Sequence, residues 1–156
     1  MNRMHTAALV VLAALALPAA AAASDERTIT KAALFEDVKA DVLDAIIARG
    51  LSADQVSDTG GMLARTAEAV GVAKPVYLHA QIVSFCSAKL AHAMAQANPA
   101  NLAGCPSQIF LYETTAAPGT VVIGYRRPFA SEDAASKAAQ DGLAALLDGI
   151  LADVKK

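Results

Sequence analysis

The feature that most constrains the fold is the apolar run at residues 75–85 (PVYLHAQIVSF), which predicts a strand. Cys86 follows this run directly, and an alanine-rich helix is predicted over residues 87–97, ended by Asn98-Pro99. Shorter strands are predicted at residues 107–113 and 120–125, and a short first strand is predicted within residues 24–32, at the alternating run Thr28-Ile29-Thr30. The strands at residues 107–113 and 120–125 are expected to form a hairpin.

Helices are predicted between these strands. Apolar residues at helical spacing indicate one helix that ends before Gly50: Phe35, Val38, Val42, Ala45 and Ile46. A second is predicted over residues 62–70, after a turn at residues 58–61 and before Gly71. Residues 51–59 are expected to be a short strand or loop, and residues 98–104 a loop. A last helix, capped by Ser131, carries the apolar stripe Leu143, Leu146, Leu147, Ile150, Leu151 and Val154.

This order of elements predicts an α+β fold, with a single, mainly antiparallel sheet and helices packed on it. The chain of 156 residues is long enough for one core, and residues 24–156 show neither a repeat nor a linker. We therefore expect a single domain over residues 24–156.

The first 23 residues have the pattern of a cleaved secretory signal peptide. Arg3 and His5 precede the apolar run at residues 7–17, and Pro18 and five alanines follow. The run is shorter than the roughly 20 residues that a spanning helix needs. We therefore expect a periplasmic or secreted protein with no membrane association after cleavage.

The composition argues against several functions. Removing Arg3 leaves 12 basic and 15 acidic residues, a formal net charge of −3, and Trp is absent. A nucleic-acid partner is therefore not expected. The sequence contains no GxSxG, GxGxxG, HExxH or phosphate-binding GxxxxGK[ST] pattern, so no catalytic residues are predicted.

Cys86 and Cys105 are the two residues on which the functional prediction centres. Export would expose both to an oxidising compartment, which favours a disulfide. A structural bridge and a reversible dithiol both fit this spacing, and two unpaired thiols remain the alternative. Cys86 precedes a predicted helix, whose N-terminus stabilises a thiolate, so it is the expected nucleophile.

Four further residues are candidates for ligand binding: His79, His92, Tyr77 and Arg126. His79 and Tyr77 are predicted on one side of the same strand, where they could line a pocket. Arg126 and Arg127 could bind an anion, although neighbours on a strand point to opposite faces. His92 is expected on a polar helix surface. No cofactor is predicted, and haem or copper held by His or Cys is the alternative.

The segment from Tyr77 to Glu113 resembles the DUF302 family of small α+β domains. The resemblance rests on Phe85-Cys86-Ser87, Leu90-Ala91-His92, Ala97-Asn98-Pro99, Cys105 and Ile109-Phe110-Leu111-Tyr112-Glu113. Phe35-Glu36-Asp37-Val38 and Arg49-Gly50-Leu51 extend it towards the N-terminus. It implies a fold similar to half of the TATA-binding protein, often a homodimer, and no established activity.

These observations predict an exported binding or thiol-redox accessory domain centred on Cys86 and Cys105. The expected partners are a second copy of the chain and either a small-molecule ligand or a redox partner protein. One alternative is a haem- or copper-binding protein, and another is a structural module with an inert disulfide.

Overall fold

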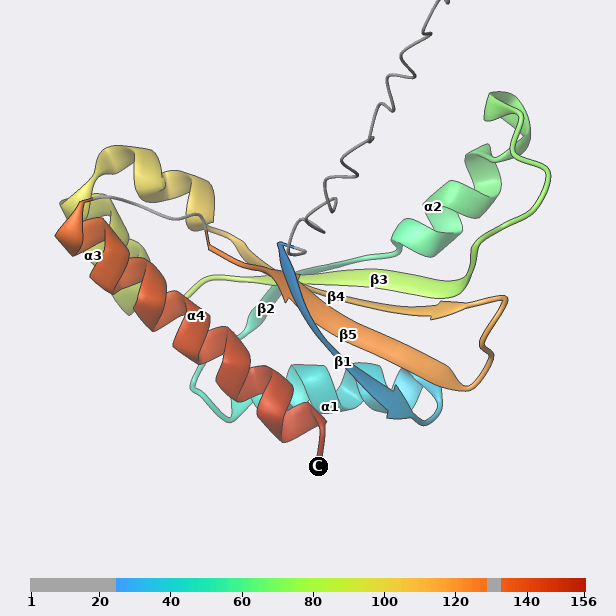
Figure 1. The fold of residues 1–156 in the computed structure, drawn as a ribbon, viewed down its shortest axis with the longest axis horizontal. Coiled ribbons are helices and arrows are strands. Elements are labelled where there is room, and N and C mark those ends of the chain that lie inside the picture. The colour runs from blue at the N-terminus through green and yellow to red at the C-terminus, as the bar shows by residue number, and fades with distance from the viewer. Residues whose placement is uncertain (1–24, 129–132) are drawn as a thin grey trace, which may run out of the picture.

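A five-stranded antiparallel sheet organises the protein (Figure 1). The structure is a computed structural model, and it describes residues 25–128 and 133–156. The predicted signal peptide at residues 1–23 lies outside these ranges. The strands lie in the spatial order β1-β5-β4-β3-β2, and their bounds are β1 Glu26–Ala32, β2 Ala53–Ser57, β3 Tyr77–Phe85, β4 Ser107–Thr114 and β5 Thr120–Arg126.

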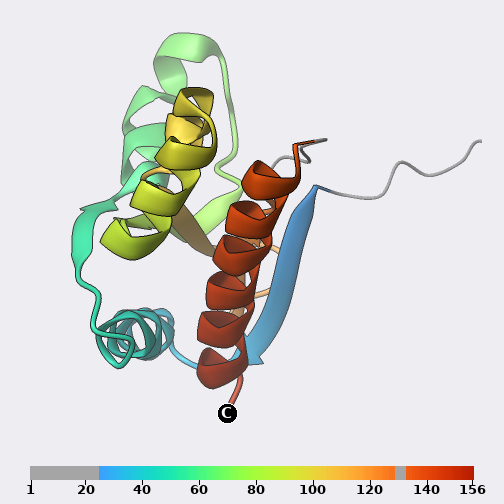
Figure 2. The same cartoon turned by 90° about the vertical axis from the view of Figure 1, so that its left-hand side faces the viewer.

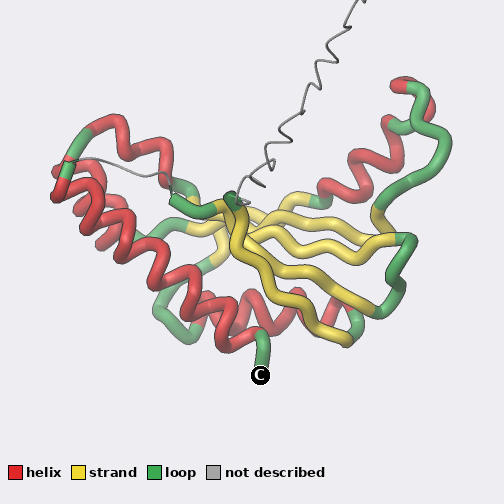
Figure 3. Tube along the Cα trace, viewed as in Figure 1, coloured by secondary structure: helices red, strands yellow, loops and turns green. Residues whose placement is uncertain are grey.

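Two helices cover one face of this sheet, as Figures 1 and 3 show. They are α1 (Phe35–Ile47) and α4 (Ala134–Val154), and both bury the apolar stripe that the sequence predicts, except that Leu146 is only partly buried. Their side chains close over the inward-facing residues of the three central strands, which are Val83, Phe85, Ile109, Leu111, Val121, Ile123 and Tyr125. The predicted α+β fold with one antiparallel sheet is therefore confirmed.

Helix α4 lies beside the edge strand β1 (Figure 2), and polar contacts hold it there. The Lys31 ammonium donates to Asp41 Oδ2 of α1 at 2.7 Å and to the Val154 carbonyl at 2.8 Å. A cation at a helix C-terminus also meets the negative end of the helix dipole. Arg49, after α1, forms an ion pair with Asp153 of α4 at 2.8 Å. These contacts hold the first and last elements of the described chain together.

A second group of helices extends beyond the end of the sheet. It comprises α3 (Ala88–Ala97), the 3-10 helix η2 (Pro99–Gly104) and the first half of α4. Residues 98–104 are thus mostly helical, in contrast to the predicted loop. Asn101 joins these elements because its buried amide donates to the Met94 carbonyl at 3.0 Å and to Ser136 Oγ at 2.8 Å.

The opposite face of the sheet is only partly covered. We call it the open face; its half-buried side chains are Tyr77, Ile82, Phe110, Tyr112 and Val122. Helix α2 (Thr59–Thr66) and the 3-10 helix η1 (Glu68–Val70) rise beside it (Figure 1). Gly60 lies so close to β3 that a Cβ there would be 2.7 Å from the Ala80 nitrogen.

The bounds of two predicted helices need correction. Residues 58–61 are not a separate turn: Asp58 caps α2 by accepting from the Gly61 nitrogen at 3.0 Å, and the helix begins at Thr59. The last helix begins at Ala134 and is capped by Asp133, which accepts from the Ser136 nitrogen at 2.7 Å. The predicted cap, Ser131, lies outside the described residues. Asp133, two residues closer to the apolar stripe than Ser131, supplies the acidic side chain that accepts from the exposed amide.

Within the described ranges, α4 is the longest helix at 21 residues. None of the helices there combines the length and the apolar content needed to cross a bilayer.

Candidate ligand-binding pocket

The two cysteines form a disulfide at one end of the sheet. Cys86 follows β3 and Cys105 follows η2, and their Cα atoms are 5.9 Å apart. The bridge closes the segment that contains α3 and η2, and Phe85 pairs with Ser107 on the adjoining strands. Of the sequence alternatives, unpaired thiols are therefore wrong. For a loop of this size, the bridge stabilises the folded protein by about 3 kcal/mol, because it lowers the conformational entropy of the unfolded chain.

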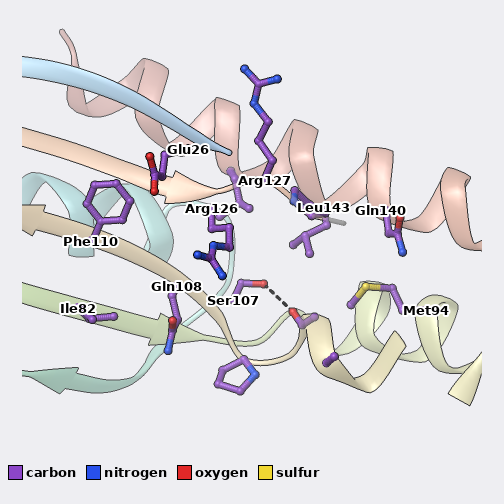
Figure 4. Close-up of a pocket in the computed structure, with 15 residues that line it drawn as sticks. Glu26, Ile82, Met94, Ser107, Gln108, Phe110, Arg126, Arg127, Gln140 and Leu143 are labelled. Carbon is purple, nitrogen blue, oxygen red and sulfur yellow. Dashed lines mark hydrogen bonds between the residues drawn. The ribbon is translucent and has the colours of Figure 1, made fainter. Parts of the chain in front are cut away.

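A pocket of about 370 Å³ lies beside this disulfide. It opens between the end of the sheet and the helical group, where β4 begins and β5 ends (Figure 4). Gly104 and Pro106, the two neighbours of Cys105, both line it. Apolar side chains from five elements supply most of its wall: Ile82, Met94, Phe110, Leu143 and Leu147, with Ala103. The disulfide thus fixes the segment that forms one wall.

Phe110 reaches the pocket from the open face of the sheet. Its ring lies over Gly124 of β5, where a Cβ would come within 2.6 Å of the Phe110 ring. The same Cβ would lie 2.6 Å from the Arg27 carbonyl oxygen of β1. Glycine is therefore required at this position, because any larger residue would push away either the ring or the neighbouring strand.

Two arginines line the pocket where β5 ends. The Arg126 side chain points towards Gln108 and Ser107, whereas Arg127 extends away from the sheet (Figure 4). Within the described residues, neither guanidinium makes a hydrogen bond or an ion pair. Glu26 pairs in register with Arg126 on the adjacent strand and also lines the pocket. Both predicted arginines therefore reach one site, although they point in different directions.

Side-chain amides and one hydroxyl complete the lining. Gln140 is 5% exposed, and its amide nitrogen donates to Asn101 Oδ1 at 3.3 Å. Ser107 Oγ donates to the Gly104 carbonyl at 3.3 Å (Figure 4). Gln108 lies exposed beside Arg126. The Ser107 hydroxyl already donates a hydrogen bond, whereas the Gln108 side chain has no hydrogen-bond partner among the described residues.

The prediction that the Tyr77 and His79 side chains lie on the same side of the strand is wrong. A register shift between these residues turns Tyr77 to the open face, where its ring meets Tyr112 edge-on at 5.5 Å. His79 remains on the other face and stacks on the buried Phe35 of α1 at 5.0 Å. A bulge adds one residue to a strand and reverses the alternation beyond it. Neither residue lines the pocket.

The two histidines are not brought together. His79 is near the start of β3, and His92 is exposed on α3, after the other end of that strand. Within the described residues, no three His, Cys, Asp or Glu side chains cluster as metal ligands do. The Glu113 carboxylate accepts from the Gly119 nitrogen at 2.7 Å, within the turn between β4 and β5.

Most pocket residues were not predicted as site residues. Gln108 and Phe110 come from a strand that carries an ordinary alternating pattern, and Leu143 and Leu147 belong to the apolar stripe of α4. Phe110 and Gln108 occupy the positions of that strand that face away from the core. The one signal in the sequence that could have indicated this pocket was therefore Phe110, an aromatic residue at an outward-facing position of a strand.

The fold and the pocket together define a small α+β domain with a disulfide-braced pocket at one end of an antiparallel sheet. Residues 26–154 match the family described as "Domain of unknown function DUF302", and the chain belongs to this family. A crystal structure of an uncharacterized conserved DUF302 protein from Bacillus stearothermophilus is similar to this fold, with a TM-score of 0.70 and 16% identity. The similarity covers 86% of this chain and 100% of that one. No curated protein matches the chain.

Proposed function

We propose that the protein is an exported accessory domain that binds a small molecule in the pocket at the end of its sheet. The observation that carries this proposal is the pocket of about 370 Å³ between the sheet, η2 and α4, with the Cys86–Cys105 bridge beside its wall. A pocket of this volume is within the range of small-molecule sites, and apolar walls with a few polar groups are typical of them.

The residues that line the pocket favour binding over catalysis. The described lining includes no histidine or cysteine, and its one hydroxyl, that of Ser107, already donates to the Gly104 carbonyl. A nucleophile needs a base within hydrogen-bond reach, and no such pair lies there. The pocket is therefore suited to holding a molecule, with the disulfide keeping its wall in place.

Two phenylalanine substitutions test this proposal. Ala103 and Ala100 are both exposed on η2, but only Ala103 lines the pocket. We expect amide NMR shifts of the wild type with a fragment set of mixed charge to cluster on the pocket residues. Ala103→Phe should abolish them and Ala100→Phe should retain them. Shifts that cluster elsewhere, or that survive Ala103→Phe, would contradict the proposal.

Export is proposed from residues 1–23 and is supported by the disulfide, which oxidising compartments favour. The intact mass of the protein from the periplasm or medium tests both points. We expect a chain that begins at Ser24 and takes up a thiol reagent only after reduction. An unprocessed cytoplasmic chain would contradict the proposal of export.

Thiol–disulfide exchange is a second candidate, because both cysteines are only half-buried. A partner dithiol would attack one sulfur of the Cys86–Cys105 bond, form a mixed disulfide and release the other cysteine as a thiol. The second thiol of the partner would then attack the mixed disulfide and release the remaining cysteine as a thiol. The partner is thereby oxidised to a disulfide, and each of the two cysteines gains one electron and one proton. A reduction potential below about −300 mV would mark the bridge as structural instead.

Haem or copper binding stays the alternative proposal from the sequence. With both sulfurs in the disulfide, it would have to use His92 or His79 singly. Absorption spectra and the metal content of the purified protein test it. A Soret band or stoichiometric copper, lost in His92→Ala or His79→Ala, would support it.

We further propose a homodimer that uses the open face and the adjoining α2–η1 segment. This region exposes several large apolar side chains, including Met62, Leu63, Val70 and Val72, and such patches often mark protein contacts. Sedimentation of Leu63→Glu tests the proposal, with Leu34→Glu as the matched control, since Leu34 precedes α1 and is 72% exposed. We expect only Leu63→Glu to yield a monomer, and a monomeric wild type would refute the dimer.

A further inference from the structure

The pocket has an apolar wall and, at one edge, two guanidinium groups without a hydrogen bond or ion pair to any described residue, and this contrast suggests a class of ligand. We propose that the pocket takes a small amphipathic monoanion, of which a monocarboxylate on a compact apolar body is the simplest case. Its acid group would lie at Arg126, and its apolar body would lie against Phe110 and Leu143. This inference rests on the proposed function, since it names the ligand of the same pocket.

The position of the arginines orients the ligand. Arg126 ends β5 and points to Gln108, and Arg127 follows at the same edge of the pocket. Leu143, Leu147 and Met94 line the pocket from the helical side. A guanidinium binds a carboxylate through two parallel hydrogen bonds, which a neutral group cannot match. The acid group is thus drawn to Arg126 at the end of the sheet, and the apolar part to the side chains of the helices and to the Phe110 ring.

The balance of charge sets the charge of the ligand. Arg126 and Arg127 contribute two positive charges, and Glu26 contributes one negative charge directly across from Arg126. The lining therefore carries a net charge of +1, which a single negative charge neutralises. Arg126 is the guanidinium that points inward, whereas Arg127 extends away (Figure 4). An amine would therefore be repelled by Arg126, and the second charge of a dianion would have no partner inside the pocket.

The volume sets the size of the ligand. About 370 Å³ is the space of about a dozen water molecules at liquid density. A benzene ring on a short chain that ends in a carboxylate is of this order. The half-buried ring of Phe110 offers such a molecule an aromatic surface.

Three probes of one shape test the proposal: 4-phenylbutyrate, 4-phenylbutanol and 4-phenylbutylamine. Each would be titrated by calorimetry into the full-length mature protein, and amide NMR would map the contacts. We expect the carboxylate to bind about tenfold more tightly than the alcohol, and the amine to bind most weakly. Added salt should reduce this preference, because the arginines are exposed.

Three variants test whether Arg126 is the side chain that recognises the carboxylate. Arg126→Gln should remove the preference for the carboxylate while leaving the affinity for the alcohol within about twofold. Arg126→Lys should keep part of the preference, since it retains the charge but not the paired donors. Arg65→Gln, on the exposed surface of α2, is the matched control and should change nothing.

The outcomes separate this inference from the proposed function. If the alcohol binds in the pocket as tightly as the carboxylate, the pocket is a binding site and the anionic class is wrong. If the amine binds best, Glu26 selects the ligand and the inference is overturned. If no probe binds at millimolar concentration and the fragment set also gives no shifts, the proposed function fails with it.

Discussion

The phenol of Tyr125 donates a hydrogen bond to Asp148 Oδ1 at 2.8 Å, which joins β5 to α4 underneath the sheet. Tyr125 is 2% exposed, and the same Asp148 oxygen receives Arg27 Nε of β1 at 2.5 Å. Three elements that are distant in sequence therefore meet at one carboxylate. The contact lies on the covered face, so its loss should affect stability without altering the pocket.

Removal of the Tyr125 hydroxyl is expected to destabilise the fold by about 1 kcal/mol, the usual net value of one hydrogen bond. Urea unfolding of Tyr125→Phe at pH 7 measures this change. Tyr112→Phe is the control, because the Tyr112 hydroxyl makes no hydrogen bond with a described residue. Equal stability of Tyr125→Phe and the wild type would show that the hydrogen bond between Tyr125 and Asp148 does not contribute to the free energy of unfolding.

The same tyrosine predicts how stability changes at high pH. Burial, and then the hydrogen bond and the charge of Asp148, raise the pKa of Tyr125 from 10.0 to about 12. The unfolded phenol therefore loses its proton before the folded one does, so stability falls as pH rises through this interval. Urea unfolding between pH 9 and 12 should show a smaller fall in Tyr125→Phe. Parallel pH profiles of the two proteins would contradict the assignment.

Replacement of both cysteines by serine should lower the free energy of unfolding by about 3 kcal/mol, because the unfolded chain regains the entropy of the open segment. Denaturant unfolding with and without a reducing agent measures it. The reductant should destabilise the wild type and leave Cys86→Ser/Cys105→Ser unaffected. Ligand binding should also weaken in this variant, since Gly104 and Pro106 flank Cys105 in the pocket wall.

Gly124→Ala should destabilise the protein by about 1–3 kcal/mol, the usual cost of overpacking. The added Cβ would lie 2.6 Å from the Arg27 carbonyl and 2.6 Å from the Phe110 ring. Thermal unfolding measures the loss, and a changed NMR signal of the Phe110 ring reports its displacement. Gly142→Ala is the control, because only the flexible Leu90 side chain approaches, at 3.3 Å. If Gly124→Ala leaves the thermal stability unchanged, β1 must be able to move away from the added Cβ.

Asn101→Ala should cost about 2 kcal/mol, since it removes the hydrogen bonds of Asn101 to the Ser136 hydroxyl and the Gln140 amide and one of the two that the Met94 carbonyl accepts. A double-mutant cycle with Ser136→Ala measures the coupling by urea unfolding. We expect about 1 kcal/mol of interaction between the two sites. Strict additivity would show that the network does not act as a unit.

The secondary structure was largely accessible from local patterns. The apolar stripe from Phe35 to Ile46 repeats every three or four residues, and such spacing determines which side of a helix is buried. The strand that ends at Phe85 was likewise evident from its length and composition. The errors occurred at ends and irregularities: the cap at Asp133 and the bulge between Tyr77 and His79. Each of these features depends on one or two residues. The periodicity of apolar residues, which is read over a longer segment, does not detect them.

The site was decided by the tertiary structure. The sequence alone determined the α+β class, the two cysteines as candidates for a bridge and the arginine pair at the end of β5 as a candidate anion site. Whether Cys86 meets Cys105, and whether Arg126 lies beside Phe110 and opposite Leu143, follows from strand register and helix docking. These contacts join residues that are far apart along the chain. Local spacing carries no information about such distances, because the packing of α4 and η2 against the sheet sets them.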